Sequence, residues 1–158
     1  MEDIIREQFD QNIEIHNRAK EQLEAGIAKA AEIIIEAYGN GKKVLLCGNG
    51  GSAADSQHIA AELVGRFKKE RKGLPAIALT TDTSIVTAIA NDYGYERIFE
   101  RQVEALGEQG DILIAISTSG NSANIVNVIK AAQDKKINII ALTGGDGGKI
   151  ADLLQEDD

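Results

Sequence analysis

Apolar positions along the first 38 residues repeat with a helical period. Ile5, Phe9 and Ile13 recur at every fourth position, and after a polar interval the pattern resumes with Leu23, Ile27, Ala31, Ile34 and Tyr38. This spacing places the side chains on one face of a helix. A glycine-rich turn at residues 39–41 ends the pattern. We therefore predict N-terminal helices over residues 1–38.

Four short apolar runs follow, and each leads into a loop and then into a stretch of helical spacing. The predicted strands are Val44–Cys47, Ala76–Leu79, Ile112–Ile116 and Ile137–Leu142. The predicted helices are Ser52–Val64, Ser84–Ala90, Ala123–Ala132 and Lys149–Leu154. Apolar strands without alternation, separated by helices, are typical of a parallel sheet that helices cover on both faces. The sequence thus predicts a doubly wound, Rossmann-like α/β fold of three layers with an N-terminal helical extension.

The predicted sheet also indicates where a ligand would bind. In an open parallel sheet, ligands bind outside the carboxyl ends of the strands. The loops that leave those ends begin at Gly48, Thr80, Ser117 and Thr143. We expect these four loops to line any binding site.

Composition narrows the class of protein. With 158 residues, 43% of them hydrophobic, residues 1–158 are predicted to form a single domain around one core. The formal net charge of −8 argues against nucleic-acid and anionic-membrane partners but permits a small anion that local dipoles hold. The single cysteine, Cys47, excludes an intrachain disulfide and is expected to be buried. No apolar run is long enough to span a bilayer and no leader pattern opens the chain, so we expect a cytoplasmic protein.

The first predicted strand leads into a glycine loop. Gly48, Gly50 and Ala53 satisfy the relaxed dinucleotide-binding fingerprint between a strand and a helix, which suggests a nicotinamide enzyme. That fingerprint requires an acidic residue about 20 positions further on, whereas the candidate Asp82 lies 34 positions after Gly48. The P-loop motif is also missing, because Gly148–Ile150 lacks its Ser or Thr. A tight turn that binds no ligand stays open as an alternative.

The third predicted strand leads into a loop rich in hydroxyl groups. Ser117, Thr118, Ser119 and Ser122 provide four hydroxyls within six residues, just before a predicted helix. Free backbone amides and the positive end of the helix dipole are available there, so a phosphate could bind without a cation. Alternatively, one hydroxyl caps the helix and the others form a turn. Because this loop shares a sheet edge with the glycine loop, we favour an anion site.

Two further groups of polar residues are candidates for chemistry. His58 and Glu62 are four positions apart on a predicted helix, with Asp55 three positions before the histidine, so all three share one face. An imidazole and a carboxylate at this spacing can ligate Zn²⁺ or act as a general base, although exposed polar pairs of this kind are also common on helices. Asn91 and Asp92 lie at the end of the next helix, where they could bind a ligand or form a cap and turn.

The remaining charged residues have simpler interpretations. The other histidine, His16, falls in the polar interval of the N-terminal helices, where we expect a surface or subunit-contact position. A basic cluster follows the first core helix and is interpreted as a solvated linker; it comprises Arg66, Lys68, Lys69, Arg71 and Lys72.

Five motifs, in order and at characteristic spacing, resemble the phosphoheptose isomerases, also called sedoheptulose 7-phosphate isomerases, of the sugar isomerase (SIS) domain superfamily. The motifs are Gly48-Asn49-Gly50-Gly51-Ser52, His58-Ile59-Ala60-Ala61-Glu62, Asn91-Asp92-Tyr93-Gly94, Ser117-Thr118-Ser119-Gly120-Asn121-Ser122 and Leu142-Thr143-Gly144. The resemblance covers nearly the whole chain.

The resemblance implies a role for each motif. The sugar chain and phosphate would be held by Asn49, Gly50, Gly51 and Ser52, and the phosphate would be cradled by Ser117, Thr118, Ser119 and Ser122. Asn91 and Asp92 would contact substrate hydroxyls. His58 and Glu62 would ligate one Zn²⁺ per subunit, and Glu62 would also contact the substrate and act as the catalytic base.

The family reaction converts sedoheptulose 7-phosphate, a ketose, to the aldose D-glycero-D-manno-heptose 7-phosphate on the route to lipopolysaccharide and other surface glycans. An enediolate intermediate is implied. The family resemblance further implies a homotetramer with active sites between subunits. The N-terminal helices exceed what the four-strand core needs, which agrees with a role in oligomerisation.

One departure and one alternative accompany this resemblance. Family members continue with a further strand and a long helix that carry a Gln and a His of the site, and neither His16 nor Gln155 matches those positions. The catalytic acid is therefore unassigned, and the sequence given is expected to be either a fragment or a variant without that acid.

The alternative function is that of a non-catalytic SIS-domain phosphosugar-binding protein, such as the regulator that associates with the replication initiator DnaA. That regulator resembles the glycine loop but lacks the carboxylate that Glu62 provides here.

Overall fold

The computed structural model describes residues 1–154, and the chain divides into two units, residues 1–35 and residues 36–158. Helix α1 (Glu2–Gly39) forms the whole of the first unit and continues into the second. The N-terminal region is thus one uninterrupted helix rather than several, since the polar interval contains no proline to break it. Along this helix, Ile5, Phe9 and Ile13 follow one another on one face, as predicted.

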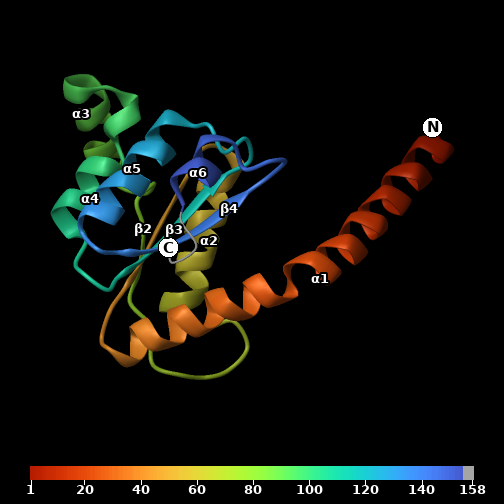
Figure 1. The fold of residues 1–158 in the computed structure, drawn as a ribbon, viewed down its shortest axis with the longest axis horizontal. Coiled ribbons are helices and arrows are strands. Elements are labelled where there is room, and N and C mark those ends of the chain that lie inside the picture. The colour runs from red at the N-terminus through yellow and green to blue at the C-terminus, as the bar shows by residue number, and fades with distance from the viewer. Residues whose placement is uncertain (155–158) are drawn as a thin grey trace. The chain divides into compact units, whose positions relative to one another are not determined.

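A four-stranded parallel sheet organises the second unit (Figure 1). Its strands are β1 (Val44–Gly48), β2 (Ala76–Ala78), β3 (Ile112–Ser117) and β4 (Asn138–Thr143), in the spatial order β2-β1-β3-β4. All neighbouring strands are parallel, with Val44 of β1 in register with Ala76 and Ile112. The predicted strands are confirmed to within one or two residues.

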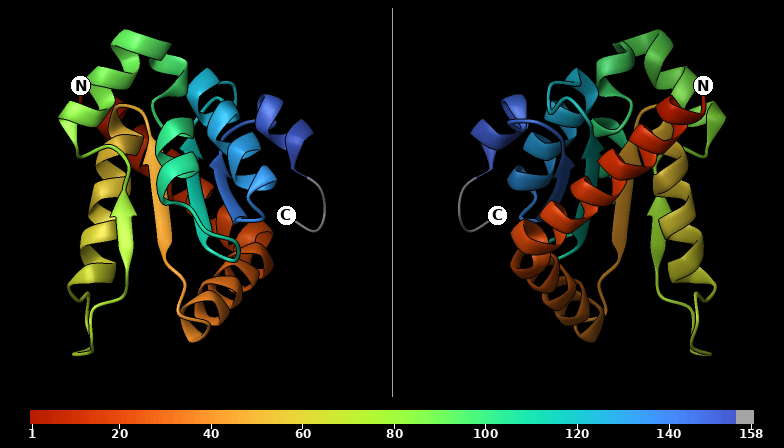
Figure 2. Two further views of the ribbon diagram at one scale, coloured as in Figure 1. Left: turned by 90° about the vertical axis from the view of Figure 1, so that its left-hand side faces the viewer. Right: turned by 90° about the vertical axis from the view of Figure 1, so that its right-hand side faces the viewer.

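Helices cover both faces of this sheet, which confirms the doubly wound α/β class. They are α2 (Gly51–Val64), α3 (Thr83–Tyr93), η1 (Tyr95–Arg97), α4 (Glu100–Leu106), α5 (Ala123–Asp134) and α6 (Gly148–Leu153). The connections from β1 to β2 and from β3 to β4 run in opposite directions across the sheet. Right-handed crossovers then place α2 and α5 on opposite faces, as the two views of Figure 2 show.

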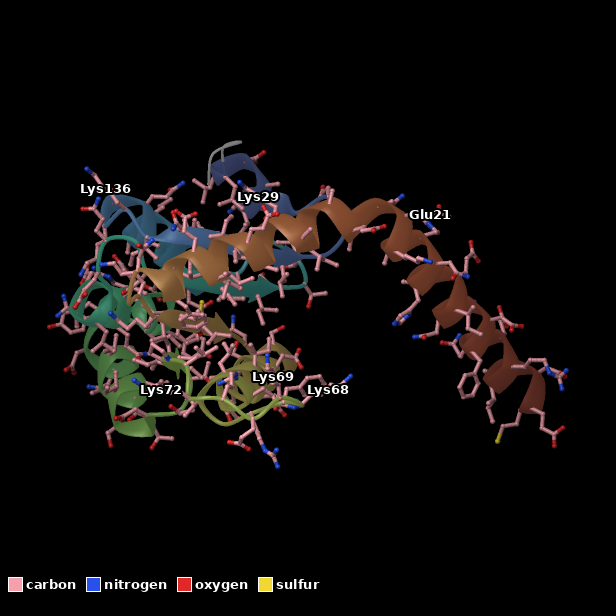
Figure 3. The ribbon with its side chains drawn as sticks, turned by 90° about the horizontal axis from the view of Figure 1, so that it is seen from below. Glu21, Lys29, Lys68, Lys69, Lys72 and Lys136 are labelled. Carbon is pink, nitrogen blue, oxygen red and sulfur yellow. The ribbon has the colours of Figure 1, made fainter. Side chains whose placement is uncertain are left out.

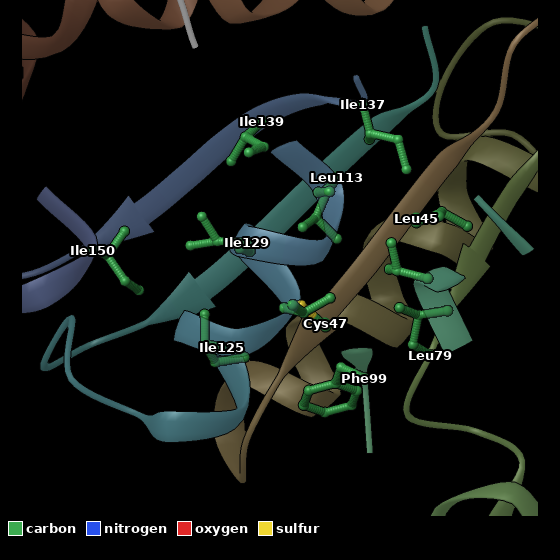
Figure 4. Packing of buried hydrophobic residues seen from close by; sticks show 14 of the residues in the cluster. Leu45, Cys47, Leu79, Phe99, Leu113, Ile125, Ile129, Ile137, Ile139 and Ile150 are labelled. Carbon is green, nitrogen blue, oxygen red and sulfur yellow. The ribbon is translucent and has the colours of Figure 1, made fainter. Parts of the chain in front are cut away.

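The main hydrophobic core lies between the sheet and the helices α4 and α5, which cover one of its faces. Leu45 and Cys47 of β1 meet Leu113 of β3, Phe99 and Ile129 there, and all of these side chains are buried (Figure 4). Burial raises the pKa of the Cys47 thiol well above its usual range, so this cysteine is a neutral core residue, as expected.

The opposite face of the sheet is also buried. Val44, Leu46 and Ile112 point away from the main core because side chains alternate along a strand, and all three are fully buried. The edge strands β2 and β4 are only partly buried, so burial on both faces does not account for their apolar runs as it does for the central strands.

Two short elements were not predicted from the sequence. η1 and α4 fill the connection from α3 to β3, where Ile98, Phe99 and Val103 are buried against the sheet. Gln102 is also buried, and its amide donates to the backbone carbonyls of Leu79 and Ile98. A helix of seven residues contains too few turns for its periodicity to be recognised.

A buried ion pair stabilises the end of the sheet opposite the predicted ligand loops. Asp111 accepts hydrogen bonds from the backbone N–H groups of Lys43 (3.1 Å) and Glu108 (2.8 Å), and its carboxylate lies 2.6 Å from the Lys43 ammonium. Burial alone would raise the pKa of Asp111, but these bonds and the charge of Lys43 outweigh burial and lower it.

Candidate active site

A pocket of about 190 Å³ lies at the carboxyl ends of β1 and β3, where the direction of the chain across the sheet reverses. It is lined by Asn49, Ser52, Ile116, Ser117, Thr118, Ser119 and Ser122. The glycine loop and the hydroxyl-rich loop therefore meet in one site, as predicted from their positions at the sheet edge. The loops after β2 and β4 do not contribute to this pocket lining within the described chain.

Two hydroxyl groups of the pocket contact each other, whereas the Ser119 hydroxyl accepts a hydrogen bond from Asn121 N (3.2 Å) within its own turn. Ser117 Oγ donates to Ser122 Oγ over 3.2 Å. Ser122 is the N-cap residue of α5, yet its side chain makes no capping bond to the helix. The alternative in which this hydroxyl serves as a cap is thus not realised, and the first amides of α5 have no partner within the helix. α2 also begins without a side-chain cap, at Gly50. In α2, however, the backbone N–H groups of residues 52–54 already donate to the carbonyl oxygens of residues 49 and 50, so the start of α5 offers more free N–H groups to an anion.

A pair of carboxamides joins the two loops. Asn49 Nδ2 donates to Asn124 Oδ1 (2.9 Å), and Asn124 Nδ2 donates to Asn49 Oδ1 (2.8 Å). The Tyr95 hydroxyl donates to the same Asn49 oxygen over 3.2 Å. Asn124 is buried in the first turn of α5 and is a site residue that sequence reasoning missed. Its partner is 75 positions away, so no local pattern reveals it.

The hydroxyl-rich loop is also attached to the loop that follows β4. Thr118 and Gly120 accept hydrogen bonds through their carbonyl groups from Gly144 N (3.0 Å) and Ile150 N (3.0 Å), respectively. Gly120 has φ +64°, and a Cβ built there would lie 1.8 Å from the carbonyl oxygen of Gly147. Only glycine satisfies both the backbone conformation and this close approach. The segment that follows β4 therefore holds the hydroxyl-rich loop through backbone hydrogen bonds and does not itself line the pocket.

His58 and Glu62 lie on the exposed side of α2. His58 Nε2 is 3.3 Å from Glu62 Oε1, which confirms that the two side chains share one face. Glu62 follows Gly51 by 11 residues, which corresponds to roughly 16 Å along the helix axis. This carboxylate is therefore far from the pocket at the start of its own helix. Among residues 1–154, no group of three or more His, Cys, Asp or Glu side chains is arranged to hold a metal ion.

The residues at the end of α3 also lie outside the pocket lining. Asn91 Nδ2 donates to Asp92 Oδ1 over 2.8 Å, and both residues are exposed. Asp82 caps the start of α3 by accepting a hydrogen bond from Ile85 N (2.9 Å). The Asp82 carboxylate, the candidate acid of the dinucleotide fingerprint, therefore serves as a helix cap.

Comparison with known proteins agrees with this architecture. The SIS domain family matches residues 8–144. The phosphoheptose isomerase of Aliarcobacter butzleri is 56% identical over 153 residues, which cover 97% of this chain and 81% of that protein. The phosphoheptose isomerase of Laribacter hongkongensis is 59% identical over 89% of this chain and 71% of that protein. The chain belongs to the phosphoheptose isomerase family.

Solved structures of phosphoheptose isomerases share the fold closely. The protein from Neisseria gonorrhoeae superposes with a TM-score of 0.93 at 48% identity, and the protein from Francisella tularensis with 0.95 at 43% identity. Both comparisons cover 99% of this chain and 82% of the solved chain. The SIS fold predicted from the motifs is confirmed, and membership of the phosphoheptose isomerase family removes the nicotinamide-enzyme alternative.

Three further expectations concern residues outside the pocket. His16 is exposed on α1, where its Nδ1 lies 3.0 Å from the carbonyl oxygen of Asn12. None of the helices within residues 1–154 is long and apolar enough to cross a membrane. Gln155, which had no assigned role, lies outside the described residues.

Proposed function

We propose that this protein converts sedoheptulose 7-phosphate to D-glycero-D-manno-heptose 7-phosphate, as a cytoplasmic step in heptose biosynthesis for lipopolysaccharide or other surface glycans. The observation that supports this proposal most directly is the hydroxyl-lined pocket between Asn49 and Ser122, at the starts of α2 and α5. A phosphosugar offers the anion that such a pocket suits. The family relatives are named for an activity on a phosphorylated heptose.

The phosphate would be bound by neutral donors. Ser117, Thr118, Ser119 and Ser122 supply hydroxyls, and the first turn of α5 supplies backbone N–H groups. No Lys or Arg lines this pocket in the described part of the chain. Hydrogen bonds from neutral groups to a charged oxygen contribute about 1.5–3 kcal/mol each. Several such bonds can hold a dianion on a protein with a net charge of −8.

The glycine loop would hold the sugar chain beside the phosphate. Asn49 already bonds to Asn124 and Tyr95, so its carboxamide fixes the loop and leaves one N–H for the ligand. Ser52 lines the pocket and presents a hydroxyl, and Gly50 and Gly51, which precede it in the loop, would present backbone groups to the sugar. We assign Asn91 and Asp92 to the hydroxyl groups at the far end of the sugar.

Glu62 would act as the base. A carboxylate can remove a proton from C1, next to the C2 carbonyl of the ketose, to give a C1–C2 enediolate. Return of that proton to C2, with transfer of the hydroxyl proton from O1 to O2, gives the aldose. Because Glu62 lies roughly 16 Å along α2 from the pocket of its own chain, we infer that the base reaches the substrate from a second copy. This places the active site between subunits, in agreement with a homotetramer.

The donor types on α2 fit a zinc ion. His58 Nε2 and Glu62 Oε1 are an imidazole nitrogen and a carboxylate oxygen, 3.3 Å apart, and can bind one metal ion together. A catalytic zinc site usually has three protein ligands, so a further ligand would come from outside this pair. Zn²⁺ bound there would stabilise negative charge that develops on a substrate oxygen. His58 would in addition hold the Glu62 carboxylate in place.

Mixing two impaired variants tests the proposal, with the phosphosugar kept well below the Kd of the Ser119→Ala variant so that each variant alone is nearly inactive. We expect Glu62→Gln to lose solvent-deuterium exchange into the ketose, and Ser119→Ala to bind the phosphosugar weakly. If the base and the phosphate cradle come from different copies, co-refolding equal amounts should restore about a quarter of the parental rate, because random assembly unites the intact halves at about one site in four. Each variant refolded alone is the control. Parental exchange by Glu62→Gln would overturn its role as the base, and no recovery on mixing would place both halves in one chain.

A further inference from the structure

The loop between α2 and β2 contains five basic residues, of which one differs from the rest in its surroundings. Arg66, Lys68, Lys69 and Lys72 are exposed, whereas Arg71 is partly buried. Figure 3 shows the three lysines on the loop that follows α2. The interpretation of this cluster as a solvated linker therefore holds for four of its residues and fails for Arg71.

The Arg71 guanidinium binds the backbone at the C-terminal end of α2. Nη2 donates to the carbonyl oxygen of Glu62 (2.8 Å), and Nη1 donates to the carbonyl oxygen of Leu63 (2.8 Å). Nη1 also lies within hydrogen-bond distance of the carbonyl oxygens of Lys72 (3.1 Å) and Gly65 (3.3 Å). The last carbonyl groups of a helix have no partner within it, so the Arg71 side chain supplies donors to groups that the helix itself leaves unpaired.

The loop returns closely to this helix end. Leu74 N donates to the Leu63 carbonyl over 3.0 Å. A Cβ at Gly73 would lie 2.7 Å from the Val64 carbonyl oxygen, so the backbone approaches the helix at a distance that only glycine allows. The close approach of residues 73 and 74 to the end of α2 therefore keeps Arg71 beside the carbonyl groups that it binds. A planar guanidinium with several fixed donors suits this group of carbonyls better than an ammonium does.

These contacts act on the turn that carries the proposed base. Glu62 lies two residues before the last residue of α2, and the ends of helices fray when their carbonyl groups have no partners. Within residues 1–154, the Glu62 carboxylate contacts His58 Nε2 at 3.3 Å and no other side chain by hydrogen bond or ion pair, so the backbone largely sets where the carboxylate lies. We propose that Arg71 is a positioning residue that holds Glu62 for proton transfer, an inference that rests on the proposed function.

Steady-state kinetics of Arg71→Lys tests this assignment. The variant keeps the charge but loses the planar fork, and a misplacement of about 1 Å can reduce a rate by up to about 100-fold. We expect kcat to fall at least tenfold, with KM and the Kd for inorganic phosphate changing less than about twofold, since the phosphate pocket lies at the other end of α2. Lys69→Ala, an exposed basic residue of the same loop, is the matched control and should retain the parental kcat.

A second variant gives a readout that general destabilisation would not produce. We expect millimolar guanidinium chloride to raise the rate of Arg71→Ala several-fold, whereas sodium chloride at equal ionic strength should not. An unchanged kcat in Arg71→Lys would overturn the proposal. So would a parallel loss of phosphate affinity, because that result would show a general structural role. Glu62→Gln, measured in the same series, separates the two levels: if it exchanges deuterium at the parental rate, the assignment of the base fails first.

Discussion

Replacing Gly120 with alanine should lower the free energy of unfolding and weaken phosphate binding, because the new Cβ would collide with the Gly147 carbonyl oxygen. The effect of this collision can be measured separately from the cost of the left-handed backbone conformation. Gly120 and Gly145 have similar backbone conformations, with φ of +64° and +58°. A Cβ at Gly145 meets no atom within 4 Å, whereas a Cβ at Gly120 lies 1.8 Å from the Gly147 carbonyl oxygen. Gly145→Ala is therefore a matched control that carries the conformational penalty alone.

The magnitudes follow from this geometry. A left-handed backbone costs a non-glycine residue about 1–2 kcal/mol, and the lower entropy of the unfolded chain returns about 0.4–1 kcal/mol. At Gly120 the Gly147 oxygen must also retreat from 1.8 Å to the 3.4 Å at which ordinary contact begins. That movement strains the bond that the Gly147 oxygen accepts from Ala151 N, the backbone bond from Ile150 N to Gly120 O, and the bond from Lys149 N to Asn121 Oδ1, each contributing about 0.5–1.5 kcal/mol.

Thermal unfolding and calorimetric titration with inorganic phosphate measure the two effects. For a chain of this size, 1 kcal/mol lowers Tm by about 2–4 °C. We expect Gly145→Ala to lower Tm by only a few degrees and to bind phosphate like the parent. Gly120→Ala should lower Tm by roughly 5–20 °C and weaken phosphate binding at least tenfold, because its loop carries Ser119 and Ser122. Equal Tm values for the two variants, with unchanged phosphate binding, would refute the reasoning.

Two further predictions concern the phosphate pocket and the buried ion pair. Ser119→Ala and Ser122→Ala should each weaken sedoheptulose 7-phosphate binding by roughly 10- to 150-fold while leaving unphosphorylated sedoheptulose nearly unaffected, and equal losses for both sugars in calorimetry would contradict the cradle. Asp111 has a lowered pKa in the folded protein, so its stabilising effect is complete above the unfolded pKa and is lost as pH falls through the folded pKa, below about pH 4. Asp111→Asn should therefore reduce the free energy of unfolding at pH 7 by about 1–3 kcal/mol and flatten its acid dependence in urea titrations, and an unchanged acid dependence would exclude Asp111 as its source.

The central strands could be predicted because burial on both faces leaves a continuous apolar run. β1 and β3 are of this kind, and their positions then determine which loops share a sheet edge. The two loops that line the hydroxyl-rich pocket could be predicted from that geometry. Gln102 and Asn124 could not be found in this way, because each is a buried amide with one partner distant in sequence, 23 positions away for Gln102 and 75 for Asn124. A polar residue in a short helix has no local signature of burial.

The position of the base relative to the pocket was also beyond sequence reasoning. The spacing of His58 and Glu62 correctly placed them on one helix face, but spacing along α2 does not show what that face meets. The helix carries its N-terminus to the pocket and its C-terminus away from it, so one element supplies both the anion site and the proposed base at opposite ends. Under the proposed function, a second copy of the chain would bring these two ends together around one substrate.

A pocket of neutral donors also suits the energetics of an isomerase. The phosphate group is the same in substrate and product, so its binding energy is uniform and does not lower the barrier between them. Very tight phosphate binding would therefore slow product release without accelerating proton transfer. The serine hydroxyls of this pocket and the start of α5 would provide several moderate hydrogen bonds to a phosphate instead of a direct ion pair. We expect them to anchor one end of the sugar, while the differential stabilisation that catalysis requires acts at the other end, where Glu62 transfers the proton.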